Sequence, residues 1–368
     1  MKKVIVGISG GVDSIVAAYL LQKEGYDIEG LFMRNWDSSI NNDIKGNPTL
    51  NENICTQEKD YNDALDVCNK LGITLHRIDF VKEYWDYVFT YFLDELKKGR
   101  TPNPDIMCNK YIKFDMFKKE ADKLGADFIA TGHYARMIDG HLYKGIDDNK
   151  DQSYFLSQVS IDKFSNVLFP VGGLRKEEVR KIAEGLELSV ADKKDSTGIC
   201  FIGERNFKEF LTNYLPNTPG NIIDIDTNEK VGEHIGLMYY TIGQRRGLDI
   251  GGNDKRLYVV GKNLDKNELY VSLGDDTKYL QSTSCIVEDI NYLSDKRPTS
   301  ANAKFRYRQK DIPVTIEYLE DGNIEVFYDN VKSVTPGQAC VIYDGDECII
   351  GGIIKEVRKD GKKLEYLL

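Results

Sequence analysis

A glycine-rich turn near the N-terminus places the tightest constraint on how this 368-residue chain folds. The apolar run Val4–Ile8 predicts a short strand, and apolar residues at helical spacing predict a helix over Asp13–Lys23. Between them stands the turn Ser9–Ser14, with the sequence Ser-Gly-Gly-Val-Asp-Ser. Glycines let a backbone fold tightly with its N–H groups pointing inward, and the N-terminus of the next helix adds partial positive charge. The turn therefore predicts a phosphate cradle, although a plain strand–turn–helix connection would also explain two glycines.

The same alternation continues over about the first 200 residues. Further strands are expected at 28–33, 74–79 and 128–131, and further helices at 60–71, 84–98 and 113–124. Strands alternating with helices predict an α/β fold, a parallel sheet with helices on both faces. Because ligands bind at the carboxyl ends of such strands, the loops after Ile8, Met33 and Thr131 should share one rim. Residues 34–57 interrupt the rhythm with polar, aperiodic sequence, and a loop of this length is usually functional or mobile.

The pattern changes near residue 205 to short strand-like runs separated by turns. A short helix is expected at 206–215 and strands at 221–226, 257–261 and 268–271. From residue 280 onward nearly every segment alternates between apolar and polar residues. We therefore expect a catalytic domain over residues 1–205, a small β-rich central domain over 206–275, and a C-terminal β-barrel over 276–368.

Composition narrows the class of protein. No apolar run approaches the ~18 residues that a membrane span needs, and the run at 4–8 is too short for a signal peptide, so a cytoplasmic location is expected. Seven cysteines and four histidines show no Cys-x-x-Cys pair or metal-like clustering, so no disulfide framework, transition metal or iron–sulfur cluster is expected. The net charge of -10 argues weakly against a nucleic-acid partner but does not describe local patches.

One cysteine, Cys108, lies within a proline-containing string, Thr101–Lys110. Its two prolines predict a stiff, non-helical loop. Cys108 has Lys110 and Lys113 nearby, and a neighbouring cation favours the reactive thiolate. Asp105, three residues earlier, is suited to act as an acid or a base. An inert cysteine in a rigid loop remains the alternative.

A second cysteine lies in the string Asp195–Gly203. Taken alone, Cys200 reads as a buried strand residue, since Ile199 and Phe201 flank it. The remaining cysteines have no comparable setting and are expected in the core: Cys55, Cys68, Cys285, Cys340 and Cys348.

The segment Ala303–Lys310 alternates strictly between cationic and other residues. As a strand it would place four cations on one face, namely Lys304, Arg306, Arg308 and Lys310. Such a face would form a track for nucleic-acid phosphates, with a simple solvated face as the alternative. The basic cluster within 355–363 is expected to be a solvated face.

The turn at Ser9–Ser14 lacks the Gly-Lys-Ser/Thr of a Walker A loop and resembles the pyrophosphate loop (Ser-Gly-Gly-x-Asp-Ser) of the N-type ATP pyrophosphatases. This resemblance implies cleavage of ATP to AMP and pyrophosphate, with transfer of AMP to an oxygen of the substrate. Adenylation turns a poor oxygen leaving group into a good one. Asp13 is implied to help position Mg²⁺ on the pyrophosphate.

Over nearly its whole length the chain resembles the MnmA-type tRNA-uridine 2-sulfurtransferases (tRNA-specific 2-thiouridylases). The matching motifs are Ser9–Ser14, Leu31–Trp36, Thr101–Lys110, Ala130–Ala135, Asp151–Leu156, Asp195–Gly203 and Tyr240–Leu248. The resemblance implies an adenine-nucleotide alpha-hydrolase-like (PP-loop) fold, with a doubly wound parallel sheet followed by the two β-rich domains.

The family mechanism can be placed on this sequence residue by residue. A persulfide-carrying sulfur donor protein would load Cys200 as a persulfide, while ATP adenylates the C2 oxygen of the wobble uridine in tRNA. Sulfur from Cys200 would then displace AMP at C2 and give 2-thiouridine. Cys108 would help to free the sulfur as a nucleophile and end in a disulfide with Cys200, which a reductant resets. Asp105 is implied as the acid or base.

The resemblance also implies ligand contacts. ATP is expected at Gly7, Ile8, Ser9, Gly10, Gly11, Val12, Asp13, Ser14, Met33 and Gly132. The target base is expected against Asn103, Pro104 and Asp105. The tRNA is expected at His133, Lys150, Asp151, Gln152, Arg306, Tyr307 and Gln338.

Two rival functions share parts of this pattern. A nitrogen-transferring ATP pyrophosphatase would not need Cys108 and Cys200, and a cytidine thiolase usually carries Cys-x-x-Cys cluster ligands. A non-catalytic RNA-binding protein could keep the glycine turn and the basic strand without both cysteines. One departure from the family pattern is a longer, Asn-rich stretch between Trp36 and Cys55, where contacts with tRNA or the sulfur donor stay open.

Overall fold

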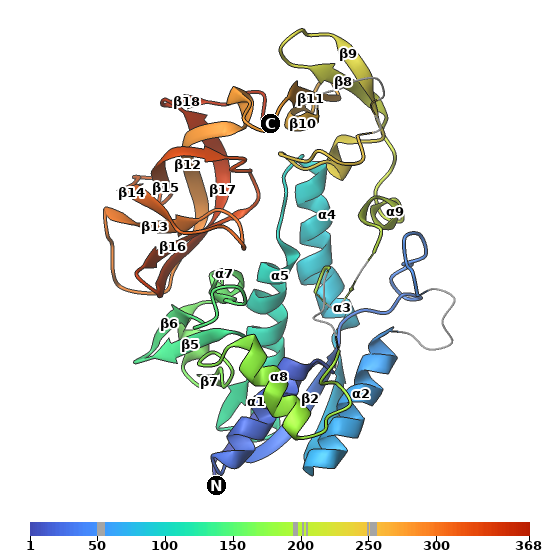
Figure 1. Ribbon diagram of the computed structural model, residues 1–368, viewed down its shortest axis with the longest axis vertical. Coiled ribbons are helices and arrows are strands. Elements are labelled where there is room, and N and C mark those ends of the chain that lie inside the picture. The colour runs from blue at the N-terminus through green and yellow to red at the C-terminus, as the bar shows by residue number, and fades with distance from the viewer. Residues whose placement is uncertain (50–55, 194–197, 201, 204, 249, 251–255) are drawn as a thin grey trace.

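The computed structural model describes residues 1–49, 56–193, 198–200, 202–203, 205–248, 250 and 256–368. In Figure 1 an α/β domain lies at the bottom, a β-barrel at the upper left and a smaller β-sheet at the upper right. The predicted fold class, a doubly wound α/β sheet followed by a small β-rich domain and a β-barrel, is confirmed. Within the described residues, no helix is long and apolar enough to cross a bilayer.

The N-terminal sheet is parallel, with the strand order β3-β2-β1-β4-β7. Its strands are β1 (Lys3–Ile8), β2 (Asp27–Arg34), β3 (Thr74–Asp79), β4 (Phe128–Ala130) and β7 (Val167–Leu168). The first four match the strands expected from the sequence. The last was not predicted, because a two-residue strand is too short to show a period.

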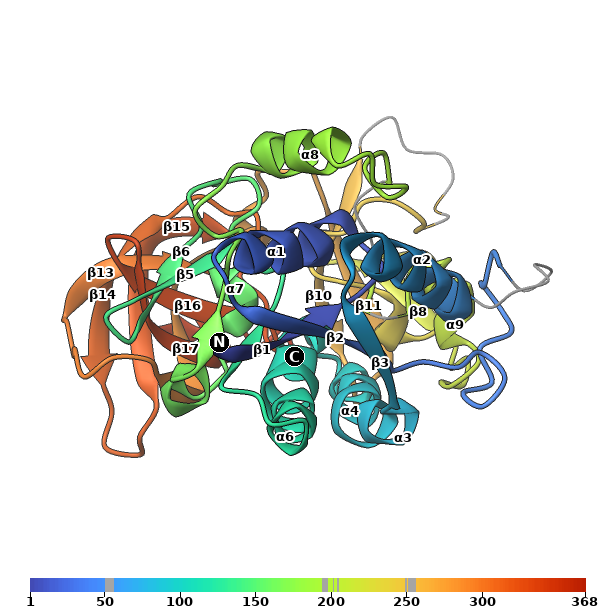
Figure 2. The same ribbon diagram turned by 90° about the horizontal axis from the view of Figure 1, so that it is seen from below.

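Helices cover both faces of this sheet, as Figure 2 shows. One face carries α1 (Val12–Lys23), α2 (Thr56–Leu71) and α8 (Lys176–Gly185), and the other carries α3 (Val81–Tyr84), α4 (Thr90–Lys97) and α6 (Phe117–Lys123). Side chains of β1 alternate between the two faces. Val4 and Val6 belong to the same core cluster as Val16 of α1, whereas Ile5 belongs to the cluster that contains Phe117 of α6.

The prediction of a non-helical loop over Thr101–Lys110 is wrong, because a helix begins within it. Asn103 caps α5 (Pro104–Met107) by accepting a hydrogen bond from the Asp105 amide at 3.1 Å, and Pro104 occupies the first helical turn, where its missing N–H costs nothing. The chain continues without a break through a π-helical segment, η2 (Cys108–Met116), into α6. A second π-helical segment, η1 (Trp85–Phe89), joins α3 to α4.

The central domain is a sheet with the strand order β10-β11-β8-β9. Its elements are α9 (Phe207–Leu211), β8 (Gly220–Asp224), β9 (Lys230–His234), the 3-10 turn η4 (Leu237–Tyr239), β10 (Leu257–Asn263) and β11 (Glu268–Leu273).

The C-terminal sheet closes into a barrel, since β12 pairs with both β15 and β17. Its strands are β12 (Gln281–Tyr292), β13 (Ser300–Lys304), β14 (Ile312–Tyr318), β15 (Ile324–Lys332), β16 (Ala339–Asp344) and β17 (Glu347–Lys359). The 3-10 turn η5 (Lys278–Leu280) precedes β12, and the short strand β18 (Lys362–Lys363) pairs with β17. A hairpin of the N-terminal domain, β5 (Ala135–Ile138) and β6 (His141–Lys144), joins this sheet where β6 pairs with β17.

The predicted cationic strand face over Ala303–Lys310 is wrong. Strand β13 ends at Lys304, and the following residues turn, with the Gln309 amide donating to the Arg306 carbonyl at 3.1 Å. Lys304 is only 9% exposed and pairs with Asp151. The alternation in sequence therefore reflects a strand end followed by a turn, and the four cations do not share one face.

The barrel docks on the N-terminal domain through buried hydrogen bonds. Helix α7 (Ser153–Leu156) lies at this junction, next to the 3-10 turn η3 (Ile161–Phe164). The Tyr154 hydroxyl donates to the Ala339 carbonyl at 3.0 Å, and the Ser153 and Tyr343 hydroxyls lie 3.1 Å apart. The Asn291 amide donates to the Ser157 carbonyl at 2.8 Å. These contacts fix the barrel against the sheet that carries the nucleotide turn.

The described part of the long polar loop after β2 is tied down. The Trp36 indole donates to Asp43 at 3.0 Å, and Asp43 forms a fully buried ion pair with Arg205 at 2.8 Å. The Lys45 amide donates to the Asn213 side chain at 3.0 Å. The loop thus connects the rim of the parallel sheet to the chain that follows Cys200, while Cys55 lies outside the described residues.

Candidate active site

The glycine turn between β1 and α1 has the geometry of an anion cradle. Gly10 has φ +73°, and a Cβ atom there would lie 2.4 Å from the Asp60 carbonyl oxygen, so only glycine fits. The Ser9 amide donates to the Ser14 hydroxyl at 3.2 Å, and that hydroxyl donates to the Gly11 carbonyl at 3.1 Å. These bonds curl the turn around the N-terminus of α1, where backbone amides and the helix dipole favour a phosphate.

Asp13 stands at the start of α1 and is held by two neighbours. The Tyr134 hydroxyl donates to its Oδ1 at 2.7 Å, and the Lys176 ammonium lies 2.7 Å and 2.8 Å from its two oxygens. Gly132 backs directly onto this turn, since a Cβ atom there would lie 2.6 Å from the Ser14 amide nitrogen. The expected proximity of Gly132 to the turn is therefore present in the fold.

A second lysine braces the turn from the other side. The Lys193 ammonium donates to the Gly10 carbonyl at 3.0 Å and lies 2.8 Å from Asp60 and 2.7 Å from Asp63. Burial alone would lower the pKa of Lys193, but the bonds to the two carboxylates raise it, so the residue is a cation. No pattern in the sequence pointed to Lys176 or Lys193, because isolated lysines are common and only the fold brings these two to the turn.

The other residues expected at the nucleotide lie under the turn. Gly7 is the next-to-last residue of β1, and a Cβ atom there would lie 3.7 Å from the Met33 methyl group of β2. Ile8 and Val12 are 2% and 4% exposed, and their side chains belong to the core beneath the turn.

The two cysteines singled out in the sequence are neighbours in space. Their sulfur atoms, Cys108 Sγ and Cys200 Sγ, lie 3.8 Å apart, and both residues are free thiols. Cys200 sits in a turn, not in the strand that its apolar neighbours suggested. Its amide donates to Asp105 at 2.9 Å, and its carbonyl accepts from the Tyr84 hydroxyl at 2.8 Å. The segment that bears Cys200 is thus held over the first turn of α5.

The two thiols differ in protonation. The hydrogen bond that the Cys108 thiol donates lowers the pKa of Cys200, and the Lys113 ammonium lowers it further against the effect of burial. Burial raises the pKa of Cys108 well above its usual range, and it also raises the pKa of Asp105. The expectation that nearby lysines make Cys108 the thiolate is therefore wrong, because burial outweighs them. Cys200 is therefore the more acidic thiol of the pair.

A stretch of three residues after β4 connects the nucleotide turn to the thiol pair. Gly132 packs against Ser14, whereas its neighbour His133 turns the other way, with Nε2 3.5 Å from the Lys113 ammonium. The Thr131 hydroxyl lies 2.7 Å from His133 Nδ1. Burial and then Lys113 lower the pKa of His133 well below its usual value, so this imidazole is neutral. The anion cradle and the two cysteines therefore share one rim of the sheet.

Comparison with known proteins gives the family. Three family models match consecutive parts of the chain: a tRNA methyl transferase HUP domain over residues 2–204, a tRNA methyl transferase PRC-barrel domain over 208–273, and an aminomethyltransferase beta-barrel domain over 282–354.

Curated relatives match over the full length. The tRNA-specific 2-thiouridylase MnmA of Mycoplasmopsis synoviae (strain 53) is 55% identical, with 100% of this chain and 99% of the relative covered. The protein of the same name from Lysinibacillus sphaericus (strain C3-41) is 53% identical, with coverage of 99% and 97%. This chain belongs to the tRNA-specific 2-thiouridylase family. Among solved structures, a 4-thiouridine synthetase bound to RNA and ATP reaches a TM-score of only 0.35, at 16% identity over 56% of this chain and 46% of that one, so the assignment rests on the sequence relatives.

In this 2-thiouridylase family member, the residues expected to bind tRNA near position 151 have structural partners. Asp151 is 3% exposed and accepts hydrogen bonds from the Gly145 and Ser153 amides. The Gln152 side chain accepts from the Tyr134 amide at 3.0 Å. Lys150 is half-buried in the adjoining turn. A role of these residues in tRNA binding stays a prediction.

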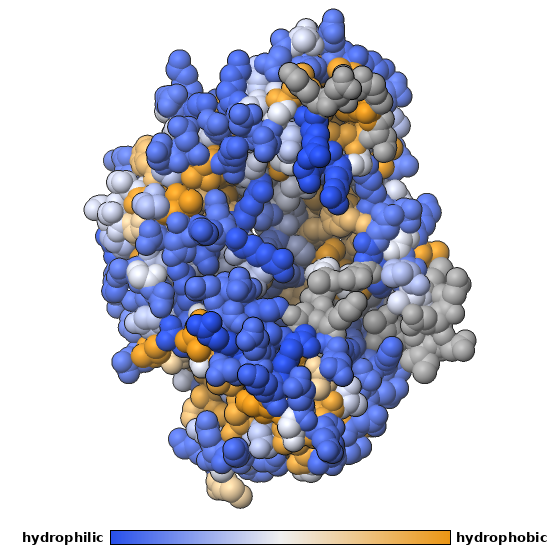
Figure 3. All heavy atoms as spheres, viewed as in Figure 1, coloured by the Kyte–Doolittle hydropathy of each residue, from blue (hydrophilic) through white to orange (hydrophobic). Residues whose placement is uncertain are grey.

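The expected tRNA contacts from the barrel lie where it meets the N-terminal domain. Gln338 donates to the Thr101 carbonyl at 2.7 Å, directly before α5. Arg306 donates to the Ser333 carbonyl at 2.7 Å, and the Tyr307 ring lies 4.3 Å from that of Phe155. Figure 3 shows that this face of the molecule is mostly hydrophilic and is hollowed between the barrel, the central sheet and the N-terminal domain.

The remaining cysteines and Lys110 behave as structural residues. Cys68, Cys285, Cys340 and Cys348 are buried free thiols, as expected for core positions. Burial raises the pKa of Cys68 to about 11, which makes it unreactive. Lys110, which the sequence placed beside Cys108, points to the Gln158 side chain at 3.4 Å, so Lys113 is the cation that accompanies the thiols.

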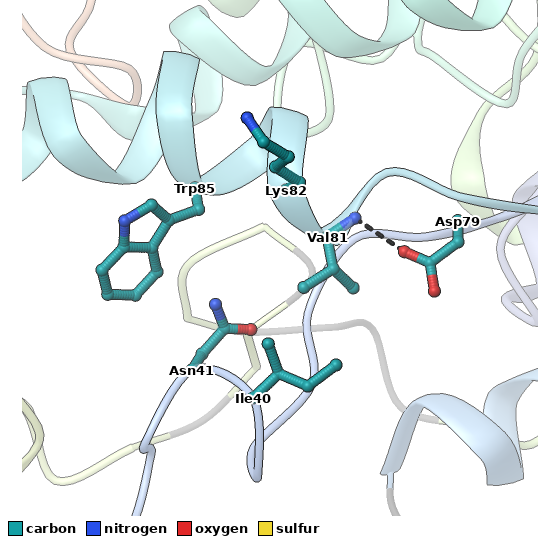
Figure 4. A pocket seen from close by; sticks show the side chains of 6 residues that line it. All are labelled: Ile40, Asn41, Asp79, Val81, Lys82 and Trp85. Carbon is teal, nitrogen blue, oxygen red and sulfur yellow. Dashed lines mark hydrogen bonds between the residues drawn. The ribbon is translucent and has the colours of Figure 1, made fainter.

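A cavity of about 410 Å³ opens beside the site, between the loop after β2 and the start of α3. Figure 4 shows its lining, which comprises Ile40, Asn41, Asp79, Val81, Lys82 and Trp85. The Val81 amide donates to Asp79 at 2.9 Å and fixes the wall of the cavity. None of the residues expected to act in catalysis lines it.

Proposed function

We propose that this protein is an ATP-dependent tRNA-uridine 2-sulfurtransferase, a transferase of sulfur-containing groups (class 2.8.1), that converts the wobble uridine of tRNA to 2-thiouridine. Its membership of the 2-thiouridylase family over the full chain supports this activity. The observation that carries the mechanism is the 3.8 Å approach of Cys108 and Cys200 on the same rim as the anion cradle. An adenylating site and a reactive thiol pair are the two parts that such a reaction needs.

The first step uses the turn after β1. The uridine C2 oxygen attacks the α-phosphorus of ATP, pyrophosphate leaves, and the base carries AMP on that oxygen. Ser9–Ser14 would hold the phosphates through backbone amides and hydroxyls, while Met33 and Gly132 would border the nucleoside. The Lys193 ammonium, which bonds the Gly10 carbonyl together with Asp60 and Asp63, would keep the turn in the shape that holds the phosphates.

Magnesium fits this site through the nucleotide itself. Asp13 presents a carboxylate at the mouth of the turn, and hard oxygen donors of this kind suit Mg²⁺. Among the described residues no cluster of three or more His, Cys, Asp or Glu side chains is arranged to hold a metal, so most ligands would come from ATP phosphates and water. The ion would supply charge neutralisation on the pyrophosphate, and Asp13 is the residue that would hold it.

The second step uses the thiol pair. The Cys200 thiolate takes the outer sulfur of a donor persulfide and becomes a persulfide itself, and the donor leaves as a thiol. The Cys108 thiolate then attacks Cys200 Sγ, so that a Cys108–Cys200 disulfide forms and hydrosulfide is released. Hydrosulfide adds to C2 of the adenylated uridine and displaces AMP. A two-electron thiol reductant restores both cysteines.

The relative acidities of the two thiols agree with this order of steps, in which Cys200 reacts before Cys108. Cys200 is the more acidic of the two thiols and would therefore be the nucleophile that receives sulfur. Cys108 must lose a proton before it attacks, and Asp105, whose pKa burial raises, would accept that proton. A disulfide needs ~2.05 Å between sulfurs, so closing the gap from 3.8 Å takes side-chain rotation and a small backbone shift.

The tRNA and the donor are the partners of this reaction. The target base would lie against Asn103, Pro104 and Asp105, which open α5 directly below Cys200. The hollow face of Figure 3 is the proposed place for the tRNA. A persulfide-carrying protein is the proposed sulfur source, and the cytoplasm, where tRNA and reductant are available, is the proposed location.

One assay tests the proposal against its rivals. The protein is incubated with ATP, Mg²⁺, a persulfide donor and tRNA, and pyrophosphate release and 2-thiouridine are both measured. Cys200→Ser should release pyrophosphate in the presence of tRNA and form no 2-thiouridine. Normal thiolation by that variant would refute the mechanism. Pyrophosphate release that depends on an amine acceptor would favour nitrogen transfer, and tRNA binding without pyrophosphate release would favour a non-catalytic RNA-binding protein.

A further inference from the structure

A lysine that the mechanism above does not use stands beside both thiols. Cys108 and Lys113 lie five residues apart on η2. An α-helix would turn such a pair to different sides, but the i→i+5 hydrogen bonding of a π-helix brings residues five apart onto nearly the same side. Lys113 consequently reaches the mouth of the thiol pair and hydrogen-bonds with Cys200.

The Lys113 ammonium is positioned by His133 and Thr131. His133 Nε2 lies 3.5 Å from it and, because the imidazole is neutral, offers a lone pair to the Lys113 N–H when Nδ1 carries the proton. That Nδ1–H points to the Thr131 hydroxyl at 2.7 Å. Phe114 and Phe169 pack against the imidazole, with ring centroids 5.8 Å and 6.1 Å away, and prevent it from swinging out.

The charges around Cys200 show what this cation does. The groups around Cys200 and Lys113 are Asp105, Cys108, Tyr84 and His133. Asp105 is the carboxylate of this group, while the Cys108 thiol, the Tyr84 hydroxyl and His133 are neutral. Without Lys113, a Cys200 anion would therefore face the Asp105 carboxylate in a partly dehydrated site with no balancing charge from these groups.

We propose that Lys113 is the cation that balances negative charge on the Cys200 sulfur, first as a thiolate and then as a persulfide, and that His133 and Thr131 position its ammonium. The persulfide stage rests on the proposed function, whereas the thiolate stage can be measured without it. His133 and Thr131 act through Lys113 and are positioning residues. Thr131–His133 also place Gly132 against the nucleotide turn, so one strand end orients both halves of the reaction.

The test is the pH dependence of Cys200 alkylation by iodoacetamide, read by mass spectrometry of the Cys200 peptide. It uses the full chain without ATP, tRNA or donor. In Lys113→Met the pH midpoint should rise, and alkylation at pH 7 should be roughly tenfold slower or more, because less thiolate is present. Lys113→Arg should keep the midpoint close to that of the wild type. Lys110→Met is the matched control, since Lys110 lies on the same helix and contacts Gln158 instead.

An unchanged midpoint in Lys113→Met, or an equal rise in Lys110→Met, would overturn the proposal. If Lys113→Met does not fold, as judged by circular dichroism, His133→Asn provides the second test. It removes the imidazole that positions the ammonium and should raise the midpoint in the same direction, and an unchanged midpoint there would equally count against the proposal.

A separate assay distinguishes this inference from the proposed function. Lys113→Met should retain less labelled sulfur on Cys200 after incubation with a persulfide donor, while binding ATP as the wild type does. If the wild-type protein forms no 2-thiouridine but the alkylation midpoints shift as expected, the proposed function fails and the assignment of Lys113 stands. If thiolation proceeds and the midpoints do not move, the proposed function stands and the assignment of Lys113 fails.

Discussion

At the scale of single residues, burial and a few close contacts decide which groups around the thiol pair carry charge. His133 is 7% exposed and neutral, whereas the same imidazole in the unfolded chain would titrate near pH ~6.5. Cys108 and Cys200 have the same chemistry in isolation, but they differ here because one donates a hydrogen bond to the other beside Lys113. Reactivity is thus assigned by position in the fold and not by residue type.

His133 makes a prediction about acid stability. Its folded pKa lies below its unfolded pKa, so the unfolded chain binds a proton first as the pH falls. Stability from this group is complete above pH ~6.5 and is lost below it, by up to about 1.4 kcal/mol per pH unit. In urea unfolding at pH 7.5 and pH 5.5, His133→Gln should lose less stability than the wild type. Equal losses in the two proteins would assign the acid sensitivity to other groups.

Gly132 makes a prediction about nucleotide binding. A Cβ atom at this position would lie 2.6 Å from the Ser14 amide nitrogen and 2.7 Å from the Asp13 carbonyl carbon, so Gly132→Ala must displace the nucleotide turn. We expect ATP affinity, measured by calorimetry, to fall about tenfold or more while the fold persists. Gly173→Ala is the control, because no atom lies within 4 Å of its Cβ position. Equal affinities in the two variants would show that the turn adapts.

At the scale of elements, the loop after β2 helps to hold the segment that carries Cys200 in position. Its Asp43 carboxylate is fully buried, accepts from the Trp36 indole and pairs with Arg205, five residues after Cys200. A helix of the other face contributes the Tyr84 hydroxyl bond to the Cys200 carbonyl. The segment that carries the reactive sulfur is therefore positioned by elements distant in sequence.

Breaking the buried ion pair should be costly. Asp43→Ala removes the carboxylate that pairs with the buried Arg205 guanidinium, and breaking a buried ion pair from one side costs about 3–5 kcal/mol. We expect a lower unfolding temperature and a lower yield of labelled sulfur on Cys200. Glu233→Ala is the control, because its pair with Lys230 is exposed to solvent and should contribute little to stability. If both variants unfold at the same temperature, the Asp43–Arg205 pair contributes nothing to stability.

At the scale of the whole molecule, the three parts of the chain meet at Lys262 of β10. Its ammonium donates to the Gly99 carbonyl at the end of α4 at 2.7 Å, and its amide donates to the Tyr366 carbonyl of the C-terminal segment at 2.8 Å. The residue is 1% exposed, and burial lowers its pKa to about 7. A titratable group therefore stands at the junction of the three parts.

Lys262 should make stability depend on alkaline pH. Because its folded pKa is depressed from ~10.4, the unfolded chain binds the extra proton between these values, and stability rises as the pH increases from about 7 towards 10. Lys262→Met should flatten this rise, measured by urea unfolding at pH 7 and pH 9.

The control for this variant is Lys266→Met, an exposed position in the turn after β10 that should change neither value. A Lys262→Met protein that keeps the wild-type pH dependence would show that the buried ammonium is not the titrating group.

Much of the fold could be predicted because it follows from local periodicity. The strands of the parallel sheet are short apolar runs, and the barrel strands alternate between apolar and polar residues. Both patterns indicate from the sequence alone which residues are buried. Two of the predictions that failed lie at element ends. The helix beginning at Pro104 was missed because a proline at a first turn looks like a helix breaker, and the segment after Lys304 was misread because a strand and a turn can share one alternating pattern.

The sequence by itself determined the parts of this site: the glycine turn that only a tight backbone can form, and two cysteines in distinctive strings. Only the tertiary structure decided how they work together. It set Cys108 and Cys200 3.8 Å apart across 92 positions of sequence, and it brought Lys113, Lys176 and Lys193 to the groups that they balance. The physical reason is that charge and thiol reactivity depend on distance and dehydration, which the linear order of residues does not contain.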